Sequence, residues 1–384
     1  MLKVLHGRRE RFQVEAVAGN KFGHPEWSPQ RIADISPFVE RLHLYRGERS
    51  WRDYIHSRAQ SAYHQRIRRR QLPVDSDYFA PPGYVRFVEK LVAERPFDAI
   101  WINNLDYAHL ASRLRRPGMR RVIDIHDITS LFRLVRKDIA YSKDLRFDFE
   151  ENFAREVELL RRFDHVIVDS RHEHEILAQR LPGGRLHFVP SQVAGLTEDA
   201  GRPYSSRVFA HDILFVGADN QPNREAVSFL LRDVMPYLVA ERENVRLAIA
   251  GTISAAANVP ETIAPNVLRL GYVNDLARLY LSSRVAVCPL RSGAGTKFKL
   301  VEAMAFGMPV VVTKHSAAAL SLENGVNGFI TDDPREYAEA VVRLIADPAL
   351  AESFSRAVAS TFAREHSTAA IGAELDVVLG AADA

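Results

Sequence analysis

A short loop between two apolar segments concentrates residues that could bind an anion. In "RSGAGTKFKLVEAMAFGMPVVVT" (Arg291–Thr313), Lys297 and Lys299 follow two glycines, and Glu302 lies within two turns of a helix expected to begin near Thr296. Glycine lets a phosphate approach the backbone, and the unpaired amides of a helix N-terminus carry about half a positive charge. Glu302 could accept two hydrogen bonds from a ribose diol. A phosphate site followed by a ribose site indicates a nucleotide.

Other interpretations of this stretch narrow the class of protein. Lys299 and Glu302 are three residues apart, so an intrahelical ion pair would also explain them. The spacing of glycines and lysines matches neither GxxxxGK[ST] nor GxGxxG, which argues against an NTPase and against a dehydrogenase. No DxD-type metal signature stands in a suitable place, and "TDDP" (Thr331–Pro334) is typical of a turn before a helix. We therefore expect no metal site.

The second half of the chain alternates segments of strand length and of helical period. The apolar segments of strand length are Ile213–Val216, Arg246–Ala250, Val267–Leu270, Val285–Leu290, Val310–Val312 and Gly328–Ile330. The helical stretches are Arg224–Leu231, Leu276–Leu281, Leu300–Phe306 and Tyr337–Ile345. This alternation predicts a parallel sheet covered by helices on both faces. Such sheets bind ligands at the carboxyl ends of their strands, which is where the anion-binding loop falls.

The first half repeats this pattern more loosely. The predicted strands are Phe12–Gly19, Phe97–Ile102, Arg121–Asp127 and His165–Ser170, and the predicted helices are Tyr84–Glu94 and Phe149–Phe163. Pro, Gly, Ser and Thr occur without period between Val189 and Asp212, which indicates a linker. We expect two doubly wound α/β domains that face a cleft, formed by residues 1–200 and residues 201–365.

The length and the cysteine content of the chain argue against several other classes of protein. A chain of 384 residues is too long for one ordinary core, and no apolar run approaches the roughly 20 residues of a membrane-spanning helix. Charges among the first ten residues argue against a signal peptide. The single cysteine, Cys288, lies in an apolar run and is expected to be buried. We therefore expect a cytoplasmic protein.

Positive charge is concentrated in the first half. Residues 1–200 hold 34 Lys and Arg against 28 Asp and Glu, a balance of +6, whereas the remainder holds 17 against 20, a balance of −3. The clusters Arg66–Arg70 and Arg113–Arg121 could meet an anionic membrane surface or a phosphorylated acceptor, or be solvated helix faces. No zinc-finger spacing, basic zipper or interleaved aromatic motif is present, which argues against nucleic acid.

The same segments resemble a known family. "PLRSGAGTKFKLVEAMAFGMPVVVT", with "LRLGYVNDLARLYLSSRVAV" before it and "NGVNGFITDD" after it, resembles the donor-binding half of a family 4 glycosyltransferase with the GT-B fold. "PFDAIWINN", "VIDIHDITS" and "EVELLRRFDHVIVDSRHEHEIL" resemble the acceptor-side half. "AREHSTAAIGAELDVVL" is similar to the closing helix that packs back on the first domain, to which we assign residues 366–384.

The resemblance implies an activity. Relatives transfer a sugar from a nucleotide diphosphate sugar to a saccharide, lipid-linked or other acceptor, usually with retention and without a metal or other cofactor. This implies a hexosyl- or related transferase of polysaccharide or glycoconjugate biosynthesis. A sugar-nucleotide epimerase and a catalytically idle, GT-B-like partner subunit are the alternatives. Peripheral contact with the inner face of an anionic membrane and a homodimer stay open.

The resemblance also assigns donor-binding residues. Glu302 matches the second glutamate of the family's paired motif and would bind the ribose, and Lys299 would meet the diphosphate. Ala294 stands where the family has the first glutamate, which usually contacts the transferred sugar. The remaining donor-binding positions are Gly217 and Asn220 in "VGADNQPN", Tyr272 and Val273 beside the base, and Arg291, Gly295, Thr296 and Lys297 near the diphosphate.

On the acceptor side, the resemblance singles out one histidine. His126 in "DIHD" ends a predicted strand and matches a histidine that contacts the transferred sugar in relatives. With Lys299 and Glu302 it completes the catalytic set that the resemblance implies. A structural histidine, hydrogen-bonded to Asp124 or Asp127, is the alternative interpretation. A departing diphosphate would be stabilised by Lys297, Lys299 and the helix N-terminus without a divalent ion.

The beginning of the chain departs from the family's order of elements. In relatives the first domain opens with a strand, a glycine-rich loop, a long helix and a second strand. "FQVEAVAGN" is similar to that second strand, with "VERLHLY" (Val39–Tyr45) as the next. "MLKVLHG" is therefore a reduced first strand or the tail of a helix, and Gly7 followed by basic residues favours the helix tail. The first domain would then be shortened and expose a sheet surface that a partner, a second copy or a bulky acceptor could cover.

Overall fold

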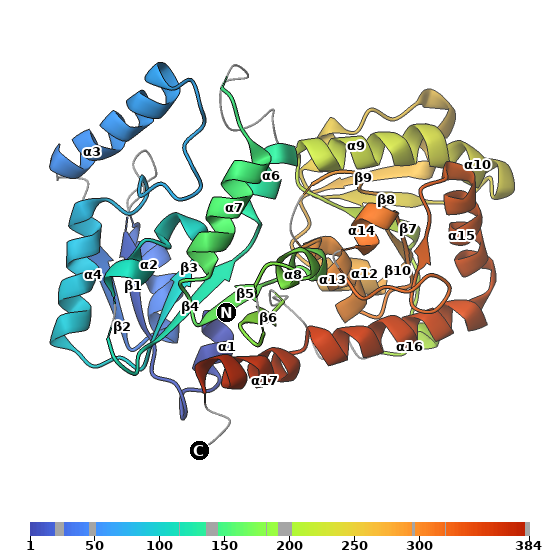
Figure 1. The fold of residues 1–384 in the computed structure, drawn as a ribbon. Helices are drawn as coiled ribbons and strands as arrows, with labels where there is room; N and C mark the ends of the chain where they lie inside the picture. Colours follow the sequence, from blue (N-terminus) through green and yellow to red (C-terminus); the bar gives the residue numbers. More distant parts are fainter. Residues whose placement is uncertain are drawn as a thin grey trace. The chain divides into compact units, whose positions relative to one another are not determined.

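The computed structural model describes residues 1–19, 27–45, 51–114, 116–135, 145–181, 183–190, 202–293, 296–318 and 320–380 (Figure 1). The chain divides into two compact units. Unit 1 comprises Met1–Val189 and Ile371–Ala384, and unit 2 comprises Pro190–Ala370. Each unit holds its own clusters of buried apolar side chains.

Among its described residues, unit 2 contains a six-stranded parallel sheet. The strands are β7 (His211–Val216), β8 (Leu247–Ala250), β9 (Val267–Gly271), β10 (Ser283–Cys288), β11 (Val310–Val312) and β12 (Phe329–Ile330). They lie in the order β12-β11-β10-β7-β8-β9. β8 and β11 are buried along their whole length. An apolar strand that is buried on both faces must be covered on both, as the sequence pattern predicted.

Helices follow these strands along the chain. They are α9 (Gln221–Phe229), α10 (Met235–Glu241), α11 (Ile253–Ala256), α12 (Leu276–Leu281), α13 (Phe298–Ala305), α14 (Lys314–Ala317), α15 (Pro334–Ala346) and α16 (Pro348–Glu365). Asp333 and Asp347 fix the starts of α15 and α16, because each accepts first-turn amides and precedes a proline at the first helical position. The predicted turn at "TDDP" is therefore an N-cap.

Unit 1 contains two parallel sheets that do not pair with each other in the described residues. The larger sheet has the order β3 (Ala99–Asn103), β4 (Arg120–Ile125), β5 (His165–Val168) and β6 (Leu186–Phe188). The smaller sheet pairs β1 (Glu15–Gly19) with β2 (Arg41–Tyr45). Each of the strands expected in this half is present, with shorter bounds than the apolar runs suggested.

The helices of unit 1 are mostly short. They are α1 (Leu2–His6), α2 (Pro29–Ile35), α3 (Trp51–Ala62), α4 (Pro82–Glu94), α5 (Leu110–Arg113), α6 (Thr129–Val135), α7 (Phe149–Leu160), α8 (Arg171–Ala178) and, from Ile371 onward, α17 (Thr368–Leu379). The π-helical turn η3 (Tyr63–Ile67) continues α3. Asp148 starts α7 by accepting the amide of Glu151.

The first residues form a helix, as the sequence favoured. Val4 and Leu5 of α1 are buried in a cluster with Val122 of β4, Ile167 of β5 and Leu375 of α17. The helical interpretation of "MLKVLHG" is therefore confirmed, and the alternative of a reduced first strand is wrong. Burial against two strands and a distant helix stabilises a segment that is too short to be helical alone.

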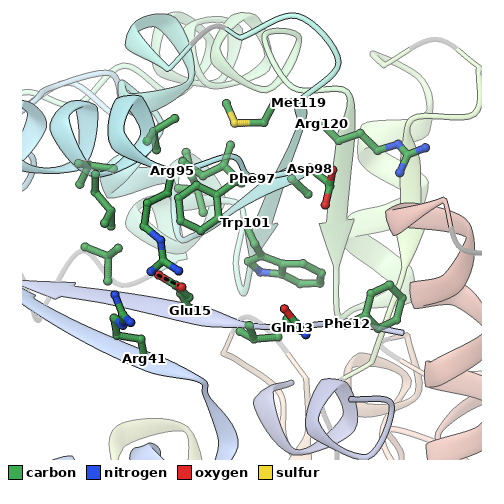
Figure 2. A pocket seen from close by; sticks show the side chains of 18 of the residues that line it. Phe12, Gln13, Glu15, Arg41, Arg95, Phe97, Asp98, Trp101, Met119 and Arg120 are labelled. Carbon is green, nitrogen blue, oxygen red and sulfur yellow. Dashed lines mark ion pairs between the residues drawn. The ribbon is translucent and has the colours of Figure 1, made fainter. Parts of the chain in front are cut away.

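A large cavity separates the two sheets of unit 1. Its volume is about 1400 Å³, and it is lined by Glu15, Val17, Ala18 and Gly19 of β1 and by all five residues of β3. Figure 2 shows Trp101 of β3 approaching the cavity from one side and Gln13 and Glu15 from the other. In the described part of the chain, β1 pairs only with β2 and β3 has no partner besides β4, so each sheet presents an edge without a further strand to the same space. The cavity thus lies between two strand edges, whereas the exposed sheet surface that the sequence predicted, and what would cover it, stay predictions.

Candidate active site

The strand order of unit 2 creates a switch point between β7 and β10. From β7 the sheet continues through β8 and β9 on one side and through β10, β11 and β12 on the other. Parallel α/β sheets bind ligands outside the carboxyl ends of the strands at such a point. α9 follows β7 and α13 follows β10 along the chain. Two helix N-termini, with amides that have no partner inside the helix, therefore begin at this edge.

Lys299 joins the first turns of these two helices. Its ammonium group, carried by α13, donates a hydrogen bond to Oδ1 of Asn223 in α9. The same ammonium lies 4.5 Å from the centre of the Phe215 ring at the end of β7. Burial lowers the pKa of Lys299, because an ammonium loses hydration there. An anion at this position would favour the charged lysine and so find a strong partner.

Glu302 lies one turn further along α13. The hydroxyl group of Tyr280 donates a hydrogen bond of 2.9 Å to Oε2 of Glu302. The Tyr280 side chain is held in place because it is buried and stacks on Phe306. Burial raises the pKa of the Glu302 carboxyl, and the Tyr280 hydrogen bond opposes this effect. Lys299 and Glu302 each take another partner, so the intrahelical ion pair that their spacing allowed is not formed.

Two side chains contact the same carbonyl oxygen in the loop before α13. Lys297 Nζ donates to the Gly293 oxygen at 3.0 Å, and His315 Nε2 lies 2.8 Å from the same atom. Gly293 has a φ of +104°, a conformation that a side chain disfavours. Lys297 is buried at the N-cap position of α13, and α13 begins at Phe298 rather than near Thr296. Lys297 thus shapes the loop, and its predicted contact with the diphosphate stays a prediction.

The loop after β7 passes close to the loop after β8. A Cβ at Gly251, whose φ is +91°, would lie 2.1 Å from the Gly217 oxygen. The amide of Ile253 donates to that oxygen at 3.3 Å. Asn220 caps α9 by accepting the amide of Asn223 at 3.1 Å. Gly217 and Asn220, both predicted to bind the donor, therefore stand in the loop that leads to the partner of Lys299.

The other predicted donor-binding residues are more dispersed. The Arg291 guanidinium lies 3.9 Å from the centre of the Phe229 ring and donates to the Asp332 oxygen, on the β12 side of the loop. Tyr272 and Val273 follow β9, at the edge of the sheet; Tyr272 is 80% exposed, whereas Val273 packs on the core. Thr296 precedes α13. Gly295 lies outside the described residues.

In unit 1, His126 follows β4 and lies beside a carboxylate that follows β5. Nδ1 of His126 is 3.9 Å from Oδ2 of Asp169, and this carboxylate is the main reason that the pKa of His126 is raised. Asp124 is buried nearby, and the loss of hydration raises its pKa to about 6. The His126 side chain is 57% exposed, so it is open to solvent. The structure pairs His126 with Asp169, a partner that the sequence did not suggest.

Two buried glutamates hold the segment after His126. Glu156 of α7 accepts the amides of Thr129 and Ser130 at 2.8 and 2.9 Å, which caps α6 from another helix. Glu173 of α8 accepts the amide of Ile128 at 3.2 Å. Burial raises the pKa of Glu173 to about 8. These carboxyl groups connect the position of His126 to α7 and α8.

Two family models match the chain. One is described as a glycosyl transferase 4-like domain and matches residues 4–192, and the other is described as glycosyl transferases group 1 and matches residues 210–347. The chain belongs to family 4 of the glycosyltransferases. The family that the sequence resembles is thus confirmed.

Curated relatives match the glycosyltransferase over part of its length. The capsular polysaccharide biosynthesis glycosyltransferase CapM of Staphylococcus aureus is 31% identical over 125 residues, which cover 30% of this chain and 32% of CapM. An uncharacterized 44.6 kDa protein in the cps region of Klebsiella pneumoniae is 25% identical over 140 residues, 34% of this chain and 36% of that protein. The matched segment spans about a third of each relative.

Solved structures resemble the glycosyltransferase over nearly its whole length. Alr3699/HepE from Anabaena, in complex with UDP, has a TM-score of 0.64 at 17% identity and covers 99% of this chain and 94% of its own. Sucrose-phosphate synthase from Thermosynechococcus elongatus has a TM-score of 0.62 at 16% identity, with coverage of 97% and 90%. At these identities the likeness concerns the fold. The glycosyltransferase has the GT-B fold, with two Rossmann-like units.

The sequence did not predict the partners of three candidate residues. Asn223, Tyr280 and Asp169 contact Lys299, Glu302 and His126 respectively. Asp169 carries a signal, since it is a polar side chain directly after the buried strand β5, and Asn223 carries a weaker one, in the first turn of the helix that follows β7. Tyr280 carries no such signal, because its tip meets Glu302 only through tertiary packing.

Two kinds of feature are absent from the described residues. No helix in that part of the chain is long and apolar enough to cross a membrane. No group of three or more His, Cys, Asp or Glu side chains in the same part is arranged to hold a metal ion.

Proposed function

We propose that the glycosyltransferase moves a sugar from a nucleotide diphosphate sugar to a saccharide, lipid-linked or other acceptor. The observation that carries this proposal is the bridge from the Lys299 ammonium to Asn223, which joins the N-termini of α9 and α13 at the switch point. Two helix N-termini and one ammonium group favour a strongly anionic ligand. The diphosphate of the donor is such a ligand.

In the proposed reaction, the bond between the anomeric carbon and the diphosphate oxygen breaks, and its electron pair stays with the diphosphate. Negative charge grows on that oxygen as the acceptor hydroxyl attacks the anomeric carbon from the same face, and the acceptor proton passes to the departing diphosphate oxygen. Lys299 is held by Asn223 beside the two helix N-termini, so in this proposal the ammonium and the helix amides would stabilise the charge with little rearrangement. Because Lys299 has lost much of its hydration, water screens its attraction to the diphosphate less. We propose retention of configuration and no divalent ion.

Glu302 is the proposed ribose ligand. The Tyr280 hydroxyl orients the carboxylate through Oε2, which leaves Oε1 for a ribose hydroxyl. A carboxylate held by a buried tyrosine loses little conformational freedom on binding, which favours affinity. His126 is the proposed contact of the transferred sugar, as the resemblance implies.

The cellular context of the proposal follows from the relatives and the charge. CapM is named for capsular polysaccharide biosynthesis, which supports a saccharide or lipid-linked acceptor. We propose a cytoplasmic enzyme of polysaccharide or glycoconjugate synthesis that contacts the inner membrane face peripherally. We also propose that the protein forms a homodimer and does not bind nucleic acid.

Thermal unfolding with UDP, GDP and ADP tests donor binding. A ligand that binds the native state raises the melting temperature, and at 100 times Kd the stabilisation is about 2.7 kcal/mol. UDP is the first nucleotide to test, because an Alr3699/HepE structure holds UDP. Lys299→Met should remove the stabilisation, whereas the exposed Lys314→Met serves as the matched control and should keep it.

Turnover then separates the enzyme from a subunit that only binds. Slow hydrolysis of the nucleotide sugar in the absence of acceptor supports the transferase. If the nucleotide sugar is bound but neither hydrolysed nor transferred to any saccharide, the catalytically idle subunit is the better account. If none of the three nucleotides stabilises the wild type, the assignment of the donor site fails.

A further inference from the structure

The polarity of α3 is reversed relative to an ordinary surface helix. Asp53 and Ser57 face the protein and are 1% and 2% exposed. Asp53 accepts the amide of Gly83 at 3.0 Å, and Ser57 donates to the Tyr78 oxygen at 3.2 Å. Figure 1 shows α3 beyond the end of α4, apart from both sheets of unit 1. The side of α3 that packs on the protein is therefore polar.

The side of α3 that faces outward is apolar and aromatic. Trp51, Tyr54 and Ile55 are 66%, 49% and 53% exposed, and in η3 Tyr63 and Ile67 are 44% and 72% exposed. We name these five residues the α3 face. Five of the thirteen large hydrophobic side chains exposed in the described part of the chain lie within residues 51–67, so they are concentrated in one segment rather than scattered singly.

Arginines flank the α3 face. Residues 51–70 contain six arginines and a single acidic residue, the buried Asp53. Guanidinium groups lie over three aromatic rings of the same segment: Arg52 over Trp51 at 5.5 Å, Arg58 over Tyr54 at 5.8 Å and Arg68 over Tyr63 at 5.7 Å. The outward surface thus combines apolar groups with positive charge that no carboxylate of the segment neutralises.

The other basic cluster differs. Arg120 and Arg116 donate to backbone oxygens, and Arg121 pairs with Asp164 through two hydrogen bonds. Each cluster has an arginine paired with a carboxylate, because Arg70 beside the α3 face lies 3.4 Å from Oε2 of Glu151. The α3 face is distinguished by the exposed aromatic and apolar side chains that adjoin its arginines.

We propose that the α3 face docks the protein on an anionic lipid bilayer. Trp and Tyr rings prefer the boundary between headgroups and acyl chains, while arginines meet the phosphates and anionic headgroups above it. A helix with an apolar outer side and a basic margin fits this boundary. This inference goes beyond sugar transfer, and it can be tested without donor or acceptor.

Flotation with vesicles tests the proposal on the full chain. The probes are vesicles of phosphatidylcholine with about 30 mol % phosphatidylserine, and vesicles of phosphatidylcholine alone. The protein should float with the anionic vesicles at about 0.1 M salt and be released at about 1 M, where the Debye length is about 3 Å. It should not float with neutral vesicles.

Two variants separate the apolar from the basic part of the surface. Trp51→Ser with Ile55→Ser removes the inserted groups, and Arg66→Glu with Arg68→Glu reverses the charge. Each basic residue near an anionic surface favours binding about fivefold, so the charge reversal should weaken partitioning at least about 25-fold. Matched controls are Tyr237→Ser with Val377→Ser, and Arg335→Glu with Arg356→Glu, all exposed elsewhere. The controls should float like the wild type.

Each result decides for or against the α3 face. Loss of flotation in both test variants, with unchanged melting temperature, supports the proposal. If the wild type fails to float with anionic vesicles at low salt, the proposal is overturned. It is equally overturned if the serine variant floats like the wild type, since charge alone would then hold the protein. A failure here would remove the peripheral membrane contact from the proposed function and would leave donor binding and sugar transfer untouched, so the two failures are distinguishable.

Discussion

At the scale of single residues, the proposed role of Glu302 is the most specific statement about the ligand. If its carboxylate accepts from the ribose diol, Glu302→Gln loses a charge-assisted hydrogen bond, and affinity for UDP falls about ten- to a hundredfold, or roughly 1.5–3 kcal/mol. A 2′,3′-dideoxy nucleotide should lose a similar amount with the wild type. The two losses should not add, because both remove the same contact.

Titration calorimetry on the four combinations of protein and nucleotide measures this coupling. Glu225→Gln is the matched control, because Glu225 accepts from Ser292 in the neighbouring loop. Fully additive losses would show that Glu302 and the diol act independently, and the ribose assignment would have to be abandoned.

Glu173 predicts a dependence of stability on pH. Its pKa is raised to about 8 in the folded protein, against about 4.3 in the unfolded chain, so between these values the folded state binds more protons. The contribution of Glu173 to the free energy of unfolding should therefore be greatest below about pH 4.3 and should fall as pH rises through this window, by up to roughly 1.4 kcal/mol per pH unit.

Glu173→Gln keeps an oxygen for the Ile128 amide and cannot ionise. The variant should lose this part of the slope and be more stable than the wild type near pH 8. Urea unfolding at several pH values measures the difference. Parallel pH profiles for the two proteins would mean that Glu173 ionises in the folded state as it does in water.

At the scale of elements, the two open sheet edges in unit 1 predict uneven hydrogen exchange. β4 is paired on both sides, whereas β3 is paired only with β4 in the described residues, and its other edge lines the cavity. The outward amides of β3 should therefore exchange at least about tenfold faster than those of β4. β6, the opposite edge of the same sheet, is the matched control and should resemble β3.

Mass spectrometry of peptides that cover residues 97–103 and 120–126 would measure these rates. Equal protection of the two strands would contradict the open edge and would mean that something covers β3 in solution.

The same elements show what the sequence could and could not predict. Buried strands such as β8 and β11 are apolar at every position, and "GTKFKLVEAMA" carries both the loop and the helix of the site, so local pattern located them. Register and neighbours are long-range properties. Asn223 lies 76 residues from Lys299, and Asp169 reaches His126 only because β5 pairs with β4. The separation of β1 from β3 has no local signature either.

At the scale of the whole molecule, the two units have separate cores. The buried cluster of unit 2 draws its members from Ile213 to Phe362, whereas the two clusters of unit 1 draw theirs from residues outside that range. Chains with independent cores often unfold in more than one step, so a single free energy need not describe this protein.

UDP should reveal these steps, because the candidate nucleotide site lies in unit 2. A ligand stabilises the unit that binds it by RT ln(1 + [L]/Kd), so calorimetry should show one transition that moves upward with UDP and one that stays. Lys299→Met should abolish the movement and leave the other transition unchanged. A single transition that moves as a whole would show that the two units unfold as one cooperative body. Nucleotide binding in one unit would then stabilise both.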